Sequence, residues 1–121
     1  MKHLIDWVEI PVADMDRACR FYRSVLGVEL QRMELAGSLY ALFPTEDRFN
    51  AGALVQGANR APSKAGTLIY FDGSPDLAQI LKKVAKAGGR VLMGKTWLSK
   101  EAGYAGVFED SESNSIGLQH M

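Results

Sequence analysis

The chain has 121 residues, of which 47% are hydrophobic and 23% charged, which is typical of one folded domain with its own core. Its 14 Lys and Arg residues balance 14 Asp and Glu residues, so it lacks the net positive charge typical of proteins that bind nucleic acids or anionic membranes. The single cysteine excludes an intrachain disulfide, and without a long apolar run or a leader-like N-terminus the sequence predicts a cytoplasmic protein that does not span a membrane.

The first half of the chain predicts a strand, a helix and three further strands. Residues 4–12 alternate as a strand, in which Trp7 and Glu9 lie on one face and aliphatic residues lie on the other: Val8, Ile10 and Val12. Asp14 is the predicted N-cap of the following helix, and Gly27 is placed to end it in a left-handed turn. The apolar positions of this helix recur at helical spacing: Met15, Ala18, Cys19, Tyr22, Val25 and Leu26. Further strands are expected at 28–35, 38–43 and 51–56.

The second half repeats this order after a connector at 58–65, which contains few apolar residues. A strand is expected at 67–72, and Ser74 followed by Pro75 predicts an N-cap and the first residue of a helix. This helix has an apolar stripe that ends before Gly88 and Gly89: Leu77, Ile80, Leu81, Val84 and Ala87. The remaining segments are divided into strands at 90–94, 103–109 and 115–119, and the loops that shape the site are expected at 44–50 and 95–103.

The two halves align with one another. When Asp14 is placed on Asp76, Gly27 falls on Gly89. In the strands, the aligned pairs are Trp7 with Leu68, Glu9 with Tyr70, Ala53 with Gly117, and Val55 with Gln119. We therefore predict an α+β fold in one domain, 1–121, made of two βαβββ units at about 1–57 and 66–121. Two curved mixed sheets, each with a helix on one face, leave a concave cavity, and their open edges favour a homodimer.

Two stretches resemble the vicinal oxygen chelate superfamily, which includes glyoxalase I, bleomycin-resistance proteins and ring-cleaving dioxygenases. The first is VEIPVADMDRACRFYRSVLGVEL, with the most specific part at 14–27. The second is FEDSESNSIGLQ, which begins at Phe108 and resembles the turn D-P-E-G-N before the last strand of the family. Because Ser111 and Ser113 replace the Pro and the Gly, we expect a looser turn here. The resemblance covers essentially the whole chain and implies the same paired βαβββ fold.

The resemblance also implies where a divalent metal ion would lie. Enzymes of this family hold it in the concave cavity with His, Glu or Gln from the first and last strands of each unit. These positions fall on four residues that cannot coordinate a metal: Trp7, Leu68, Ala53 and Gly117. We therefore predict no metal and no cofactor. A displaced site built from Glu9 and Gln119 stays open, although two oxygen donors without a His form a poor transition-metal site.

Glu9 is the strongest candidate for chemistry, because a carboxylate that faces a cavity loses hydration and acts as a base or as a hydrogen-bond acceptor for a ligand. The alternative is an ion pair with Arg20 or Arg32. Trp7 offers a flat surface for stacking, or else fills the space of the missing metal. Tyr70 either binds a ligand or hydrogen-bonds to Glu9.

The other members of the predicted ligand site come from the second unit. Gln119 is a neutral hydrogen-bond donor and acceptor on the same face as Gly117, and Leu68 occupies the position that aligns with Trp7. In this hypothesis Trp7 and Tyr70 hold an organic ligand that Glu9 and Gln119 orient.

Five further residues carry weaker hypotheses. Lys95 and Trp97 are expected in a loop over the cavity mouth, where Lys95 meets an anionic ligand or simply solvent. Phe49, in the other loop, acts as a lid, anchors an interface or packs on its own loop. Cys19 is expected to pack rather than to react, and His120 has no triad or metal-ligand context.

Three functions remain open from the sequence. The first is a metal-free protein that binds a small organic molecule, similar in kind to bleomycin-resistance proteins. The second is a metal-dependent lyase, isomerase or dioxygenase with a displaced site, and a metal-free acid–base enzyme that uses Glu9 lies between these two. The third is a regulatory or interaction module. A homodimer is expected, and neither nucleic acid nor a membrane is expected as a partner.

Overall fold

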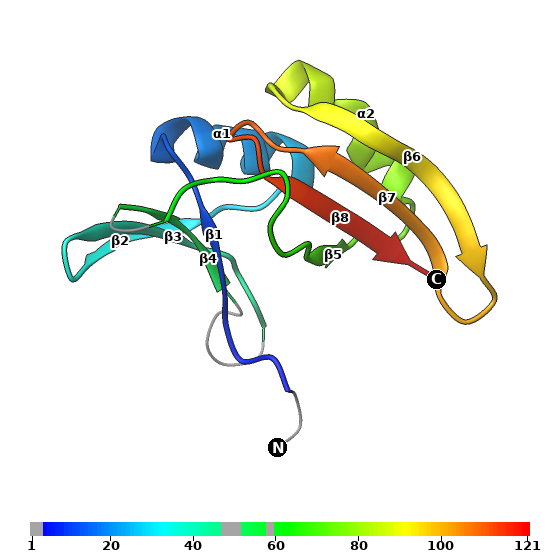
Figure 1. Ribbon diagram of the computed structural model, residues 1–121, viewed down its shortest axis with the longest axis horizontal. Coiled ribbons are helices and arrows are strands. Elements are labelled where there is room, and N and C mark those ends of the chain that lie inside the picture. Colours follow the sequence, from blue (N-terminus) through cyan, green and yellow to red (C-terminus); the bar gives the residue numbers. More distant parts are fainter. Residues whose placement is uncertain (1–3, 47–51, 58–59) are drawn as a thin grey trace.

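Two four-stranded sheets, each with one helix, make up the chain (Figure 1). The computed structural model describes residues 4–46, 52–57 and 60–121. The elements of the first unit are β1 (Val8–Pro11), α1 (Met15–Leu26), β2 (Gln31–Leu35), β3 (Ser38–Leu42) and β4 (Gly52–Gln56). Those of the second are β5 (Tyr70–Asp72), α2 (Leu77–Ala87), β6 (Arg90–Ser99), β7 (Gly103–Glu109) and β8 (Ser115–His120). The predicted α+β fold of two βαβββ units is confirmed.

The two sheets have the same topology. The strand order is β1-β4-β3-β2 in one and β5-β8-β7-β6 in the other, and the first pair of each is parallel. Glu9 pairs with Ala53 across β1 and β4, and Tyr70 pairs with Gly117 across β5 and β8. These pairs occupy equivalent places, which agrees with the alignment of the two halves.

The helix ends follow from local sequence, with one correction in the second unit. In α1 the Asp14 carboxylate accepts a hydrogen bond from the Arg17 N–H at 3.1 Å, and Gly27 ends the helix with a φ of 69°. In α2 the cap is Asp76 rather than Ser74, because its carboxylate accepts a hydrogen bond from the Ala78 N–H at 3.1 Å. The backbone N–H of Ser74 instead donates to the Asp72 carboxylate in the turn after β5.

Helix α2 ends at Gly88, with a φ of 110°, the first of the two glycines predicted to end it, whereas Gly89 is the one that aligns with Gly27. Gly89 has a different role, because a Cβ there would collide with the carbonyl oxygen of Glu109. The backbone of α2 therefore leaves the helix one residue earlier than that of α1, and Gly89 permits the close approach to β7.

Several predicted boundaries were wrong, and the strand predicted at 28–35 begins only at Gln31. The first strand covers only Val8–Pro11 of 4–12, and the strand predicted at 67–72 covers only Tyr70–Asp72. The loop expected at 95–103 is mostly strand, because β6 continues to Ser99 and pairs with β7 through several register shifts. Bulges of this kind let a strand continue where an alternating pattern is interrupted.

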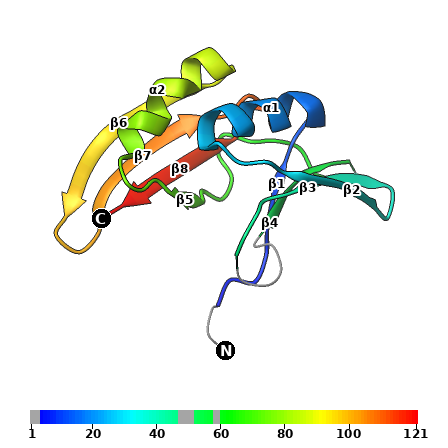
Figure 2. The same ribbon diagram turned by 180° about the vertical axis from the view of Figure 1, so that it is seen from behind.

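The core lies between the sheets and the two helices, which pack side by side (Figure 2). Tyr22 contacts Phe43 of its own unit, with ring centroids 5.8 Å apart, whereas Phe21 contacts Phe108 of the second unit at 5.9 Å. Helix α1 thus buries two adjacent sides, one against its own sheet and one against the second unit. The predicted apolar stripe described only the first side, so it omitted Phe21 and included Cys19, which is only partly buried.

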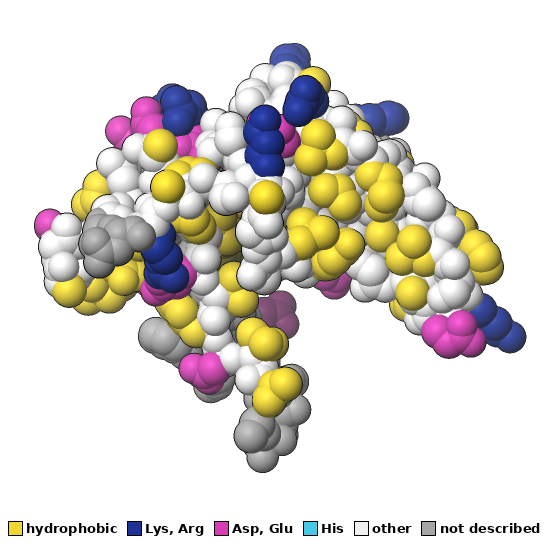
Figure 3. All heavy atoms as spheres, viewed as in Figure 1, with side chains coloured by type: hydrophobic (Ala, Val, Ile, Leu, Met, Phe, Trp, Pro, Cys, Tyr) yellow, Lys and Arg dark blue, Asp and Glu magenta, His cyan; other side chains and the backbone are white. Residues whose placement is uncertain are grey.

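The opposite face of the sheets is free of helices. We call it the helix-free face; it carries Glu9 of β1 and Tyr70 of β5, with Trp7 and Leu68 two residues before them on the same side. Hydrophobic side chains gather there over the second sheet (Figure 3). Within the described chain, neither helix is long and apolar enough to cross a membrane.

Candidate functional site

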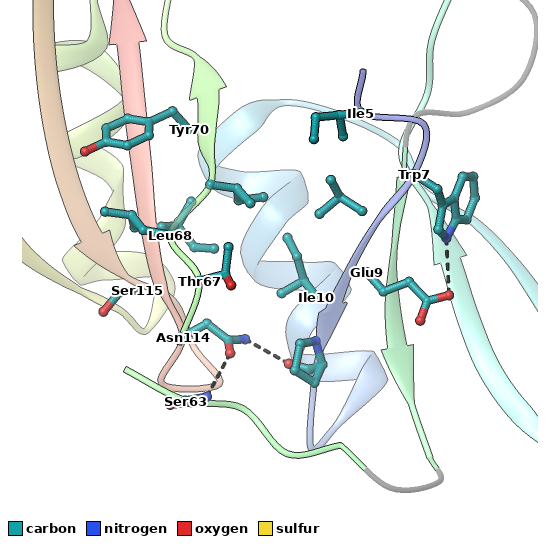
Figure 4. Close-up of a pocket in the computed structure, with 14 residues that line it drawn as sticks. Ile5, Trp7, Glu9, Ile10, Ser63, Thr67, Leu68, Tyr70, Asn114 and Ser115 are labelled. Atoms are coloured by element: carbon teal, nitrogen blue, oxygen red, sulfur yellow. Dashed lines mark hydrogen bonds between the residues drawn. The ribbon is translucent and has the colours of Figure 1, made fainter. Parts of the chain in front are cut away.

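A pocket of about 650 Å³ lies between the two units (Figure 4). Strand β1 forms one wall, and the segment at 63–70 with the start of β8 forms the other. Strands β1 and β5 are the edge strands of their sheets, and they face each other without pairing. Both strands are fully described, and no Cα atom of β1 lies within 8 Å of a Cα atom of β5, and this separation leaves the space of the pocket. Edge strands that remain unpaired leave their backbone groups open to a ligand or to another chain.

Glu9 and Trp7 form the polar part of the β1 wall. The indole Nε1–H of Trp7 donates to Oε2 of Glu9 at 3.2 Å, and the guanidinium of Arg60 binds Oε1. The Glu9 side chain is 22% exposed. The alternative prediction, an ion pair between Glu9 and an arginine, is confirmed, but the arginine is Arg60 of the connector and not Arg32, which pairs with Asp16 at 2.9 Å.

Tyr70 and Leu68 lie on the opposite wall. In Figure 4 they stand beside β5 and β8, whereas Trp7 and Glu9 lie on the other side of the pocket, next to β1. The Tyr70 side chain is 51% exposed, and its ring covers Gly117, where a Cβ would collide with the ring carbons. Trp7, Glu9, Leu68 and Tyr70 therefore line one pocket from two sides, and Gly117 lies beneath the Tyr70 ring.

Gln119 lies apart from this group. Its Nε2 donates to the carbonyl oxygen of Ala102, in the turn that joins β6 and β7, and the residue pairs with Asp72 of β5. It is not among the residues that line the pocket. The structure therefore does not bring Gln119 next to Glu9.

Lys95 and Trp97 were placed wrongly by the sequence, because both belong to β6 rather than to a loop at the pocket mouth. The Lys95 ammonium bonds to the Asp76 carboxylate at 2.9 Å and lies 4.5 Å from the centre of the Tyr104 ring. Together with the N–H of Ala78, this ammonium lowers the pKa of Asp76. Lys95 thus supports the start of α2. Phe49 lies outside the described residues.

Asn114 and its neighbours are pocket residues that the sequence analysis did not identify. The Asn114 amide donates to the carbonyl oxygen of Pro11 at 2.8 Å and accepts from the Ser63 N–H at 3.1 Å, so it ties β1 to the connector. Thr67 and Ser115 add hydroxyl groups to the same wall. The available signal was the Asn of the D-S-E-S-N turn, a position that also contributes to the family resemblance.

That turn is tightly bonded rather than loose. The buried Asp110 carboxylate accepts from the Tyr22 hydroxyl at 2.6 Å and from the N–H groups of Glu112 and Asn114 at 2.8 and 2.9 Å. Burial raises the pKa of Asp110, against the opposing effect of the Tyr22 hydrogen bond. Ser113 adopts a φ of 72°, the conformation that Gly usually supplies. The hydrogen bonds to Asp110 hold this conformation without a glycine.

The residues at this site do not fit a divalent metal ion. The four positions that the resemblance assigns to ligands carry an indole, an isobutyl group, a methyl group and a hydrogen atom: Trp7, Leu68, Ala53 and Gly117. Within the part of the chain that the structure describes, no group of three or more His, Cys, Asp or Glu residues could hold a metal ion. The Glu9 carboxylate already has Trp7 and Arg60 as partners.

Replacing Gly117 with alanine is expected to move the Tyr70 ring and to lower the free energy of unfolding by about 1 kcal/mol. The added Cβ would collide with the ring, which is half exposed and can rotate toward solvent. Loss of nuclear Overhauser contacts between the Tyr70 ring and residue 117 checks the movement, and urea unfolding checks the cost. Gly94→Ala is the control, because a Cβ there meets open space. If the ring stays in place in Gly117→Ala, it is not free to rotate.

Comparisons with known proteins agree with this fold. Residues 4–116 match the family described as Glyoxalase/Bleomycin resistance protein/Dioxygenase superfamily. No curated protein matches the sequence. Among solved structures, the chain is similar to a glyoxylase/bleomycin resistance protein/dioxygenase domain from Frankia sp., with a TM-score of 0.75, 18% identity and 98% of each chain covered.

A glyoxalase I variant from Zea mays gives a TM-score of 0.73 and 20% identity, with 93% of the present chain covered. The present chain covers only 45% of the maize chain. A possible glyoxalase from Bacillus cereus gives 0.64 and 18%, with 96% of this chain and 97% of that chain covered. At these identities the structural likeness shows the fold alone. The family match covers nearly the whole sequence, and the chain therefore belongs to the glyoxalase/bleomycin resistance protein/dioxygenase superfamily.

Proposed function

We propose that this protein binds a small, uncharged organic molecule in the pocket between β1 and β5, without a metal ion. The observation that carries the proposal is a pocket of about 650 Å³ whose lining includes an aromatic residue from each unit, Trp7 next to β1 and Tyr70 on β5. In Figure 4 the Trp7 indole lies beside Glu9, on the side of β1 away from Tyr70. A space of this size is in the range of small-molecule sites, which are mostly apolar with a few polar groups that orient the ligand.

The charges around the pocket support an uncharged ligand. Glu9 is the one charged residue among the described lining residues, and its carboxylate is neutralised by Arg60. A charged ligand group would lose its hydration there without gaining an opposite charge, which is costly. Neutral hydrogen-bonding groups for orientation lie on Thr67 and Tyr70, and the Ser115 hydroxyl, which donates to the carbonyl oxygen of Lys64 at 2.9 Å, can accept a hydrogen bond.

The missing metal ligands support binding over metal-dependent catalysis. Chelation of two substrate oxygens needs several N or O donors in fixed positions. Here the assigned positions hold Trp7, Leu68, Ala53 and Gly117. We infer that this family member has lost the metal site and kept the cavity. A stoichiometric divalent metal in the purified protein that disappears in Glu9→Gln would contradict this.

We also propose that the protein acts as a homodimer whose interface uses the helix-free face and the open sheet edges. Large apolar side chains are exposed there on both units: Met33, Leu35, Leu68 and Tyr70. Exposed apolar patches with unpaired strand edges mark association surfaces. Light scattering during size-exclusion chromatography at micromolar concentration tests this, and a mass of one chain would refute the dimer.

The two tryptophans provide a test of ligand binding. Trp7 lines the pocket, whereas Trp97 lies on β6 and not in the pocket lining. The probe is 4-nitrobenzyl alcohol, an uncharged aromatic alcohol that quenches indole fluorescence. We expect saturable quenching in Trp97→Phe, where Trp7 is the remaining reporter. Trp7→Phe is the matched control and should show only the linear quenching of random collisions. Linear quenching in both variants would contradict a binding site at Trp7.

A further inference from the structure

A second, smaller pocket adjoins the first and has a different character. Its volume is about 170 Å³, and it is lined by aliphatic side chains and three aromatic rings: Val8, Ile10, Ile69, Phe43, Tyr70 and Phe71. No charged residue is among the described residues that line it. Apart from the Tyr70 hydroxyl, these side chains offer no hydrogen-bonding group.

Strand alternation explains this position. Val8 and Ile10 point to the opposite side of β1 from Trp7 and Glu9, and Phe71 points to the opposite side of β5 from Tyr70. The small pocket therefore lies on the helix side of the gap between the two edge strands. Four residues line both pockets, so the small one adjoins the large one: Val8, Ile10, Ile69 and Tyr70.

The size of the small pocket selects one kind of group. An apolar protein cavity of about 150 Å³ stays dry and accepts benzene. The volume here, about 170 Å³, is in the same range. The rings of Phe43 and Phe71 pack against each other, with centroids 5.3 Å apart and planes at 56°, and both line the pocket, where an entering ring would contact them. Water would find too few partners on these walls, so a ring can displace it at little cost.

We propose that the small pocket receives one six-membered aromatic ring of the ligand, while the hydrogen-bonding part of the ligand stays in the large pocket near Thr67 and Ser115. This rests on the proposed function and narrows it to uncharged compounds that carry a single phenyl or benzyl group. Glu9 and Arg60 lie outside the small pocket and leave the ring in an apolar environment.

The test uses three alcohols with the same head group: benzyl alcohol, cyclohexylmethanol and 2-naphthalenemethanol. Their affinities are measured by amide chemical-shift titration of the full chain. Benzyl alcohol is expected to bind about tenfold more tightly than 2-naphthalenemethanol, because the fused rings exceed the small pocket and push the head group away from Thr67 and Ser115. It is also expected to give nuclear Overhauser contacts to the methyl groups of Val8 and Ile69. Cyclohexylmethanol is expected to bind more weakly, because it lacks the ring-to-ring contacts with Phe43 and Phe71.

Two variants change the pocket in opposite directions. Val8→Phe fills it and is expected to weaken benzyl alcohol binding about tenfold, whereas Val91→Phe, at an exposed position of β6 outside the pocket, is the matched control. Ile69→Ala enlarges the pocket and is expected to reverse the preference toward 2-naphthalenemethanol. Circular dichroism confirms that each variant folds, and Ile69→Ala still tests the size argument if Val8→Phe does not fold.

The outcomes separate this inference from the proposed function. If 4-nitrobenzyl alcohol saturates at Trp7 but neither Val8→Phe nor Ile69→Ala changes the affinity for the three alcohols, the ring site is refuted and the binding function stands. If no aromatic alcohol binds the wild-type chain, both are refuted.

Discussion

Replacing Glu112 with alanine is expected to lower the free energy of unfolding by about 3 kcal/mol. The Glu112 side chain is 0% exposed, and its carboxylate accepts hydrogen bonds at 2.9 Å from the backbone N–H groups of Ala13 and Asp14. It also accepts from Arg17 Nε at 2.6 Å and from the Ser111 hydroxyl at 3.0 Å. Its removal leaves the backbone donors before α1 without an acceptor and removes one of the connections between the two units.

Urea unfolding followed by circular dichroism measures this loss. Glu112→Gln retains the shape and one acceptor oxygen, so it is expected to lie between the wild type and Glu112→Ala. The control is Glu101→Ala, at an exposed turn between β6 and β7, which is expected to change stability by no more than about 0.5 kcal/mol. Equal unfolding curves for Glu112→Ala and Glu101→Ala would show that the carboxylate does not join the two units.

The pH dependence of this contribution has a definite sign. Burial alone would raise the pKa of Glu112, but the hydrogen bonds from Arg17, Asp14, Ser111 and Ala13 outweigh it and hold the pKa below its usual value of 4.5. The stabilisation is therefore fully present above pH 4.5 and is lost as the pH falls through the folded-state pKa. Glu112→Gln should lose less stability in this acidic range than the wild type does.

The helices show which features the sequence alone could predict. The Asp14 cap and the Gly27 ending of α1 depend on contacts within a few residues, and both were correct. At α2, Ser74 and Asp76 are both suitable caps by type. Lys95 of β6 bonds to Asp76 and favours it as the cap. Because Lys95 is 19 residues away in the sequence, the residues around the helix start do not predict this contact. Local sequence therefore identified the presence of the helix better than its first residue.

The candidate site shows the same limit. Alternation in β1 correctly separated Trp7 and Glu9 from the core residues, because the side-chain period of a strand is local. The cation at Glu9 is Arg60 of the connector, and no periodic pattern predicts the path of such a segment. Ser113 suggested a loose turn by residue type, whereas the turn is held by bonds to Asp110 from within the turn and from Tyr22, and the Tyr22 bond is long-range and could not be predicted locally.

Replacing Tyr22 with phenylalanine is expected to cost about 2 kcal/mol at neutral pH, because a hydrogen bond to a charged group is lost. Tyr22 is 0% exposed, and its hydroxyl donates to the Asp110 carboxylate at 2.6 Å. Burial and the negative charge of Asp110 raise the pKa of Tyr22 well above 10. The neutral phenol therefore stabilises the fold fully below pH 10, and this contribution is lost as the pH rises further and the unfolded chain releases its proton.

The measurement is urea unfolding of the wild type and Tyr22→Phe across a series of pH values above and below 10. Wild-type stability should decline more steeply on the alkaline side, because Tyr22→Phe has no proton to release at this site. Tyr40→Phe, on β3, is the matched control: it leaves the bond between Tyr22 and Asp110 intact and should retain the wild-type slope. An alkaline decline of the same steepness in Tyr22→Phe would mean that this buried bond does not join α1 to the turn before β8.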